Sequence, residues 1–124
     1  LIRDLKKFNN KQSKPNVLIM GLTFKENCPD IRNSKVFEII DTLINKKVNI
    51  SLYDNNVDKQ LLKIKYKKLI IKKPKHKFYD LILIAVAHND FKKLGSSKIK
   101  KFGKNSVKIY DLKNLFKNDN FFKF

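Results

Sequence analysis

The sequence predicts an α/β fold: a Rossmann-like, doubly wound and mostly parallel five-stranded sheet with helices on both faces. Residues 17–20 and 81–86 are unbroken apolar runs, which are typical of strands buried on both faces of a parallel sheet. Between them, five apolar residues have the spacing of a helix packed on a core: Val36, Ile39, Ile40, Leu43 and Ile44. Because strand and helix patterns alternate, right-handed crossovers give a parallel sheet covered on each side.

The first fourteen residues are polar and rich in lysine, with Leu1, Leu5 and Phe8 at helical spacing. We expect residues 1–14 to be the end of an upstream helix or a linker, in a chain that is a fragment of a longer protein. Pro15 disfavours helix in the residue before it, so the domain is expected to begin there.

The first strand ends at Gly21 and is followed by a loop of about a dozen residues, although ordinary strand-to-helix loops have roughly 2–6. This loop leaves the carboxyl end of a strand, where open α/β sheets place their ligands. Ser34 is the expected N-cap of the following helix. That helix should end near Asn45, with Asn45 or a lysine behind it in the left-handed conformation.

Weaker segments follow this helix. Residues 48–53 alternate apolar and polar, which predicts a half-buried second strand. Residues 57–64 predict a short helix, and residues 69–71, flanked by lysines, predict a third strand at the edge of the sheet.

The second buried run gives a fourth strand at residues 80–86. Two short helices ending at Gly95 and Gly103 precede a fifth strand at residues 107–110. The domain is expected to span residues 15–117.

An apolar-rich C-terminal tail follows at residues 118–124. Its phenylalanines, Phe121, Phe122 and Phe124, are expected to pack on the body of the domain or on chain absent from this sequence.

We expect the strand order 3-2-1-4-5. The order reverses between strands one and four, and open α/β sheets bind ligands at such a reversal. The sequence therefore predicts a crevice there, lined by Phe24, Lys25, His88 and Lys113.

The composition describes one globular domain. The chain has 124 residues, enough to bury a core, and its apolar content of 42% is too high for disorder. No apolar run approaches the ~20 residues of a membrane span, and the N-terminus lacks the apolar core of a signal peptide. A single cysteine excludes an intrachain disulfide and a cysteine-based zinc site, and a cytoplasmic protein fits these features. We predict no metal site.

The formal net charge is +18, yet only Arg3 and Arg32 are arginine, and the other 27 basic residues are lysine. Proteins that read nucleic acid rely on arginine for bidentate contacts. Lysine, asparagine, isoleucine and phenylalanine are abundant together, which favours a coding bias and a solvated lysine surface over a functional polyanion patch. The charge still favours anionic ligands in general.

Residues 21–34 read GLTFKENCPDIRNS, which resembles the G-L-x-F-K-x-x-x-x-D-x-R-x-S signature of the nucleotide-sugar 6-dehydrogenases. The resemblance is to their C-terminal, UDP-sugar-binding domain. The ENCPD variant and the AVAHNDF turn at residues 85–91 resemble the branch that acts on UDP-N-acetylhexosamines. Asp111-Leu112-Lys113-Asn114 resembles the closing motif of the family. The similarity covers about residues 17–117.

The resemblance implies a function for the chain and roles for four residues. Phe24, Lys25 and Lys113 would bind a UDP-sugar, and Arg32 would reach NAD held by a companion domain of the same full-length chain. The sequence lacks the Gly-x-Gly-x-x-Gly fingerprint of an NAD domain. The full-length enzyme would oxidise C6 of a UDP-N-acetylhexosamine to the uronic acid in two NAD-dependent steps. It would be a homo-oligomer that supplies surface polysaccharide synthesis.

No catalytic residue is expected in this chain. The cysteine that the family uses lies in a separate motif, so Cys28 is not expected to be catalytic, and the fragment alone should be inactive. Asp54 is either a turn former or a ligand contact, and both interpretations remain open. Two interpretations also remain open for His88, which is either a nucleotide contact or a helix-entry residue.

Two rival functions predict different behaviour. A stand-alone basic module that binds nucleic acid would bind duplexes in a strongly salt-dependent way, without preferring UDP. A structural domain without a ligand would be indifferent to alanine at Lys25 and Arg32.

Overall fold

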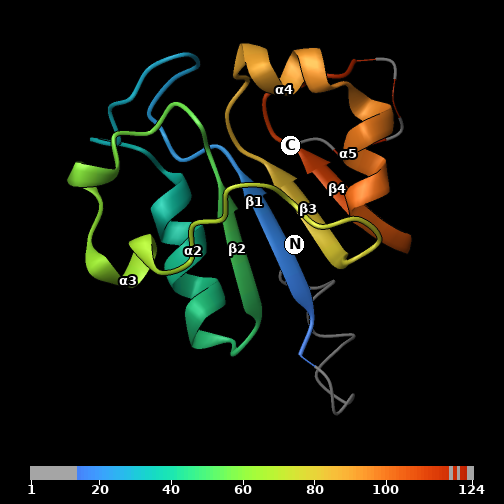
Figure 1. Ribbon diagram of the computed structural model, residues 1–124, viewed down its shortest axis with the longest axis horizontal. Coiled ribbons are helices and arrows are strands. Elements are labelled where there is room, and N and C mark those ends of the chain that lie inside the picture. Colours follow the sequence, from blue (N-terminus) through green and yellow to red (C-terminus); the bar gives the residue numbers. More distant parts are fainter. Residues whose placement is uncertain (1–13, 118, 120, 123–124) are drawn as a thin grey trace.

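A four-stranded parallel sheet organises the computed structural model, which describes residues 14–117, 119 and 121–122 (Figure 1). The strands are β1 (Asn16–Met20), β2 (Asn49–Tyr53), β3 (Tyr79–Ile84) and β4 (Gly103–Asp111), in the order β2-β1-β3-β4. The expected α/β fold with a parallel sheet is confirmed. Apart from Lys14, the helix end or linker expected at residues 1–14 lies outside the described residues, as does Phe124 of the tail.

The predicted order of four of the five strands is confirmed, but the predicted third strand, at residues 69–71, is not. Residues 69–71 make only an isolated parallel bridge, between Leu52 of β2 and Ile70, on the outer side of β2. The amide hydrogens of Leu69 and Ile70 are used by the preceding helical turn, where they donate to the carbonyls of Tyr66 and Lys67. The segment therefore lies where a fifth strand was expected, but it forms no ladder.

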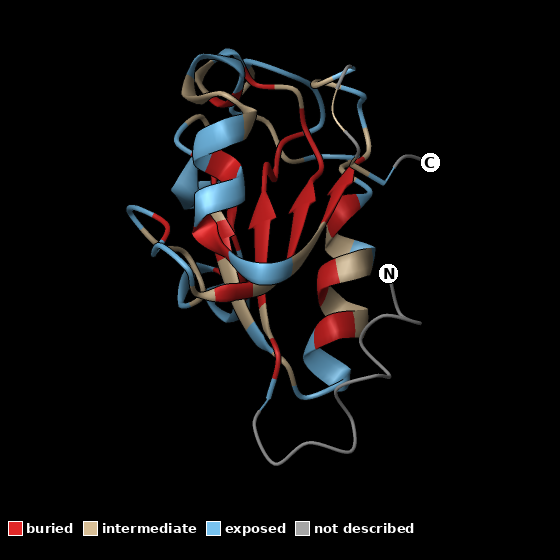
Figure 2. Cartoon of the chain, turned by 90° about the vertical axis from the view of Figure 1, so that its right-hand side faces the viewer, coloured by how far each residue is buried: buried red, intermediate tan, exposed pale blue. Residues whose placement is uncertain are grey.

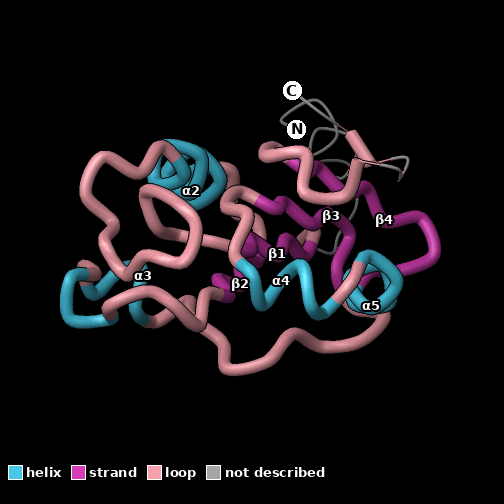
Figure 3. The backbone as a smooth tube through the Cα atoms, turned by 90° about the horizontal axis from the view of Figure 1, so that it is seen from above, coloured by secondary structure: helices cyan, strands magenta, loops and turns pink. Residues whose placement is uncertain are grey.

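Helices cover both faces of the sheet. They are α2 (Val36–Asn45), α3 (Ile64–Lys67), α4 (Asn89–Leu94) and α5 (Ser96–Phe102), with a 3-10 turn, η1, at Lys59–Leu61. Figure 3 shows α2 on one face and α5 on the other. The prediction of one helix over residues 57–64 is thus replaced by two shorter elements, η1 and α3.

Side chains of successive strand residues point to opposite faces, so each strand contributes to two cores. Val17 and Ile19 of β1 pack in the cluster that contains α2, whereas Leu18 and Met20 pack in the cluster that contains α4 and α5. All four are fully buried, as the unbroken apolar run predicts. Figure 2 shows the strands buried at the centre and the outer helix faces exposed.

The start of α2 differs from the expectation. Lys35, not Ser34, is the N-cap residue, and it makes no side-chain cap hydrogen bond. The Ser34 hydroxyl instead donates to the carbonyl of Thr23, with an Oγ–O distance of 3.4 Å, and so ties the end of the loop to its beginning. At the other end of α2, Lys47 takes the left-handed conformation, with a φ of 57°.

Gly21 begins the long loop at a point where a side chain would not fit. Its φ is 100°, and a Cβ added there would lie 2.7 Å from the Cβ of Val86. Glycine thus lets the chain that leaves β1 pass directly against the end of β3.

The C-terminal residues that are described pack on the body of the domain. Phe121 packs against the cluster of α4 and α5. Phe122 forms a parallel bridge with Tyr110, and their rings stack with centroids 5.0 Å apart. No helix in the described part of the chain is long and apolar enough to cross a bilayer.

Candidate functional site

The carboxyl ends of β1, β2 and β3 meet at one end of the sheet, together with the long loop at residues 21–35 and helix α4 (Figure 1). This is the end at which parallel sheets place their ligands. Four polar side chains link the connections there: Thr23 and Asn27 after β1, Asp54 after β2 and His88 after β3. We call these four residues the clamp.

Asp54 is the centre of the clamp and is buried. Its Oδ1 accepts from the backbone N–H groups of Asn56, at 2.7 Å, and Val57, at 3.1 Å. Its Oδ2 accepts from the N–H of Leu22 at 2.7 Å and lies 3.0 Å from Nε2 of His88. The turn-former interpretation of Asp54 is therefore confirmed, and the same carboxylate also holds the start of the loop after β1.

The hydrogen bonds of His88 define its tautomer. The N–H of Asn27 lies 2.9 Å from Nδ1, and a backbone N–H can only donate, so Nδ1 is an unprotonated acceptor. The ring is then neutral, with its hydrogen on Nε2 directed at Asp54 and, at 3.3 Å, at the Thr23 hydroxyl oxygen. The Thr23 hydroxyl in turn donates to the carbonyl of Lys25.

His88 is also the residue at which α4 begins. It is the N-cap residue of that helix and makes no side-chain cap hydrogen bond. Its side chain is fully buried. The helix-entry interpretation is therefore confirmed, and both ring nitrogens have partners within the chain.

Asn27 joins the loop to α4 from the other side. Its φ is 60°, a left-handed conformation that asparagine tolerates better than most residues. Its Oδ1 accepts from the N–H of Asn89, the first residue of α4, at 2.9 Å. Asn27 and the turn at His88 are therefore connected by two hydrogen bonds in opposite directions.

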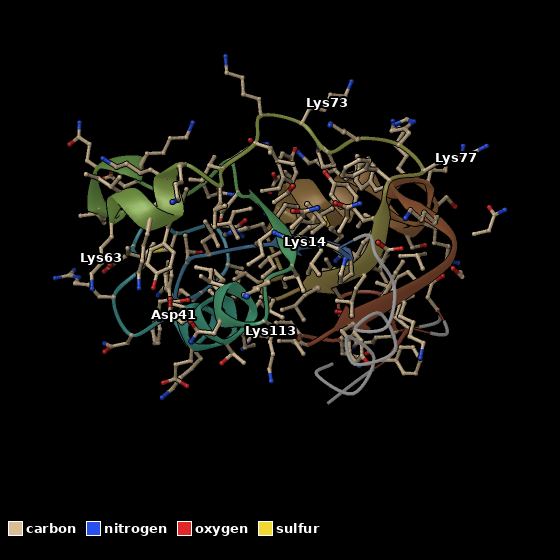
Figure 4. All side chains as sticks on the ribbon, turned by 90° about the horizontal axis from the view of Figure 1, so that it is seen from below. Lys14, Asp41, Lys63, Lys73, Lys77 and Lys113 are labelled. Atoms are coloured by element: carbon tan, nitrogen blue, oxygen red, sulfur yellow. The ribbon has the colours of Figure 1, made fainter. Side chains whose placement is uncertain are left out.

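A cavity of about 220 Å³ lies beside the clamp, between the start of α2 and the ends of β1, β3 and β4. Phe24, a residue that is 55% exposed, and Lys113 line it together. Lys113 lies near α2 in Figure 4. The other lining residues are Thr23, Asn33, Ser34, Lys35, Val36, Ile39, Ala85, Val86 and Leu112.

Asp111 shapes the turn that carries Lys113. Its buried carboxylate accepts from the N–H groups of Leu115 and Phe116, each at 2.9 Å, and Asn114 takes a φ of 53°. The last strand therefore ends in a tight turn whose backbone N–H groups donate to the Asp111 carboxylate. The exposed Lys113 side chain of this turn lies at the cavity.

Two of the four residues expected in the crevice do not line this cavity. Lys25 is exposed on the loop beside Phe24, and His88 is enclosed in the clamp. The structure thus brings Phe24 and Lys113 together, and it places His88 behind the loop instead of in the crevice.

Arg32 lies on the same loop and is held by Asp30. The Nε atom of Arg32 is 3.0 Å from both carboxylate oxygens, and its Nη2 is 2.8 Å from Oδ2. The hydrogen bond from Arg32 lowers the pKa of Asp30 from 3.8 to about 2, and the pKa of Arg32 is raised in return. The Arg32 side chain remains 83% exposed.

The lysines are spread over the surface, as the solvated interpretation predicts. Each lysine in the described part of the chain is exposed, apart from the half-buried Lys108. Figure 4 shows Lys63, Lys73 and Lys77 at separate points of the periphery. A larger cavity of about 690 Å³ lies along the outer edge of β4, between several of these lysines, Phe121 and Phe122. The described residues contain no cluster of three metal-ligating side chains.

The sequence motifs locate the loop and the last turn but do not reveal the hydrogen bonds of the clamp. The motif at residues 21–34 contains Thr23 and Asn27, but their partner His88 is more than sixty residues away in the chain. Asp54 could be singled out by its place after the second strand, and His88 by its place in the motif at residues 85–91. Their pairing depends on the strand order, which brings three connections to the same end of the sheet.

Comparison with known proteins assigns this arrangement to a family. Residues 18–118 match the UDP binding domain of the UDP-glucose/GDP-mannose dehydrogenase family. A UDP-N-acetyl-D-glucosamine 6-dehydrogenase from Pseudomonas aeruginosa is 43% identical over 103 residues, covering 83% of this chain and 24% of the relative. Protein CapL from Staphylococcus aureus is 33% identical over 123 residues, covering 96% of this chain and 28% of CapL.

Solved structures agree with this assignment. The structure of a UDP-D-ManNAc dehydrogenase from Pyrococcus horikoshii superposes with a TM-score of 0.66 at 26% identity, covering 98% of this chain and 28% of that one. The chain therefore spans about a quarter of the length of its relatives. These comparisons give no support to a nucleic-acid-binding module. From its motifs, its fold and these matches, the chain belongs to the UDP-glucose/GDP-mannose dehydrogenase family and corresponds to its UDP binding domain.

Proposed function

We propose that this chain binds the UDP part of a UDP-N-acetylhexosamine, in the cavity between the start of α2 and the turn after β4. The observation that supports this most strongly is that Phe24 and Lys113, from loops after two different strands, line the same cavity. Both belong to the motifs of the family. The similarity to a UDP-N-acetyl-D-glucosamine 6-dehydrogenase favours an N-acetylated sugar.

The cavity has the chemistry that a nucleoside diphosphate needs. Phe24, Val86 and Leu112 offer apolar surface for a planar base, and Lys35 and Lys113 offer ammonium groups for phosphate oxygens. Typical small-molecule pockets enclose about 300–1,000 Å³, so a cavity of about 220 Å³ accommodates part of such a ligand. We assign the remainder to a companion domain. Lys25, exposed beside the cavity, would contact the sugar diphosphate on that side.

Arg32 is proposed to contact NAD bound by the companion domain. The Arg32 guanidinium is exposed, and Asp30 accepts from its Nε and Nη2 atoms. Nη1 is directed away from Asp30, so it can donate to an anionic cofactor. NAD, when bound, would accept hydride from C6 of the sugar. The described residues contribute binding and orientation to that reaction.

The whole protein is proposed to be an NAD-dependent UDP-N-acetylhexosamine 6-dehydrogenase. It would act as a homo-oligomer in the synthesis of surface polysaccharide precursors. In this arrangement the catalytic cysteine and the dinucleotide fingerprint belong to the remaining three quarters of the enzyme, and Cys28 of this chain is a half-buried loop residue.

Calorimetric titration of the chain with UDP, UDP-N-acetylglucosamine and GDP tests the proposal. We expect UDP and UDP-N-acetylglucosamine to bind and GDP to bind at least tenfold more weakly, a difference of about 1.4 kcal/mol. Phe24→Ala and Lys113→Ala should each weaken UDP binding about tenfold. Lys46→Ala, which removes an exposed lysine at the far end of α2, is the matched control and should leave affinity unchanged.

Equal binding of UDP and GDP, or equal effects of Lys46→Ala and Lys113→Ala, would show that only the general positive charge attracts the ligand. The measurement should be repeated on the full-length protein, where the companion domain completes the site. There, Lys25→Ala and Arg32→Ala distinguish the proposal from a domain without a ligand, which predicts no effect of either substitution.

A further inference from the structure

We propose that His88 and Asp54 are positioning residues for the UDP site: without touching ligand, they hold the loop tip at residues 22–27 that presents Phe24 and Lys25. This inference rests on the proposed function. His88 and Asp54 are a buried polar pair, and neither takes part in the ligand contacts assigned above to Phe24, Lys25, Arg32 and Lys113.

The clamp holds the loop on both sides of Phe24 and Lys25. The N–H of Leu22 donates to Asp54 at 2.7 Å, and the N–H of Asn27 donates to His88 at 2.9 Å. Phe24 and Lys25 lie between these two anchors in the sequence. Both anchors accept from backbone atoms, so they define the path of the main chain irrespective of the side chains it carries.

The tip has an additional connection between the anchors. The Thr23 hydroxyl donates to the carbonyl of Lys25 at 2.9 Å, and its oxygen lies 3.3 Å from Nε2 of His88. One imidazole therefore contacts the backbone of Asn27, after Phe24 and Lys25, through Nδ1 and the side chain of Thr23, before them, through Nε2.

Ordering such a loop costs free energy. A long connection loses conformational entropy when it is held in one geometry, and a ligand that has to order it binds more weakly. The hydrogen bonds of the clamp are made within the chain, and Asp54 and His88 are buried. The clamp therefore orders the tip without using any contact to the UDP-sugar.

The two ring nitrogens of His88 can be tested separately. In His88→Asn the amide oxygen can take the place of Nδ1 and accept from Asn27, but the side chain is too short to reach Asp54. In His88→Gln the amide nitrogen can take the place of Nε2 and donate to Asp54, while the acceptor for Asn27 is lost. A role in folding alone predicts that both variants lose UDP affinity only in proportion to their loss of stability.

The experiment measures UDP affinity by calorimetry, stability by urea unfolding, and backbone order at residues 24 and 25 by NMR relaxation. We expect His88→Asn to keep UDP affinity within about threefold of the unsubstituted chain, and His88→Gln to lose about tenfold. We also expect the amides of Phe24 and Lys25 to become more mobile in His88→Gln and to stay ordered in His88→Asn. Equal affinity and equal tip order in both variants would overturn the proposal.

A measurement on the unsubstituted chain covers the case in which the variants do not fold. The amide hydrogen of Asn27, in an exposed loop residue, should exchange slowly with solvent because it is bonded to His88, and the ring of His88 should show a protonated Nε2. Rapid exchange of this amide would mean that the clamp is not formed, and would also overturn the proposal. If neither the unsubstituted chain nor the full-length protein binds UDP, the proposed function fails, whereas tip order and amide exchange still decide on the clamp.

Discussion

The pair formed by Asp30 and Arg32 shows how much of one residue's environment a sequence can reveal. Both residues belong to the recognised motif, so their place in the loop after the first strand could be predicted from the sequence. Their mutual contact could not, because it requires the turn of the backbone that brings the N–H of Arg32 to within 2.9 Å of the Asp30 carboxylate. The pair leaves the arginine exposed but restricts its orientation.

This pair gives a prediction about pH. Because the Arg32 hydrogen bond lowers the pKa of Asp30, the pair stabilises the loop at pH values above the ordinary carboxyl pKa, and this contribution is lost as the pH falls through about 2. An NMR titration of the Asp30 carboxyl carbon should give a midpoint near 2. In Arg32→Ala it should rise toward 3.8, and a midpoint near 3.8 in the unsubstituted chain would contradict the geometry.

Gly21 and Gly95 give a matched pair of substitutions. Both have a positive φ, 100° and 87°, but a Cβ at Gly21 would collide with Val86, whereas nothing lies within 4 Å of one at Gly95. Urea unfolding should show that Gly95→Ala lowers the free energy of unfolding by about 2 kcal/mol, from backbone strain, and that Gly21→Ala lowers it by about 4 kcal/mol, from strain and overlap. Equal losses would mean that Val86 can move aside and that the close approach is not required.

At the scale of elements, unbroken apolar runs proved the most reliable guide. The runs that became β1 and β3 are buried on both faces, and no other pattern in the chain indicates a central parallel strand as directly. The weak third strand is reduced to one bridge, and the N–H groups of Leu69 and Ile70 donate to carbonyls of the preceding helical turn, which hydrophobicity does not show. On α2 the expected stripe is buried at Val36, Ile40 and Leu43, while Ile44 at its end is exposed.

The contact between α2 and α3 supplies a prediction at this scale. The Tyr66 hydroxyl donates to Asp41 of α2 at 2.7 Å, and this bond is the largest cause of the lowered pKa of Asp41. Tyr66→Phe should reduce the free energy of unfolding by about 1 kcal/mol at neutral pH, measured by urea denaturation.

Lys65 provides the control for that substitution. Its ammonium group lies 3.2 Å from the same Asp41 carboxylate, but both side chains are exposed to solvent. Lys65→Ala should therefore change stability by no more than about 0.5 kcal/mol. Equal losses of stability from Tyr66→Phe and Lys65→Ala would mean that the surface ion pair, and not the tyrosine hydroxyl, connects α2 and α3.

At the scale of the whole molecule, the strand order explains why the site is only partly visible in the sequence. The two motifs at residues 21–34 and 111–114 can be recognised as separate segments, and the order β2-β1-β3-β4 brings their ends together. Lysine content could not identify the site, because lysines are exposed around the described surface. The clamp could not be predicted either, since it depends on three connections that only the folded sheet places side by side.

We propose that UDP binds beside Phe24 and Lys113 and not elsewhere on a surface rich in lysine. This can be tested by an amide NMR titration of the chain with UDP, compared with one using inorganic pyrophosphate. We expect UDP to shift resonances around the cavity, at Phe24, Val36, Leu112 and Lys113, and Phe24 to respond to UDP but not to pyrophosphate. Shifts concentrated at the outer edge of β4, or identical patterns for both ligands, would contradict it.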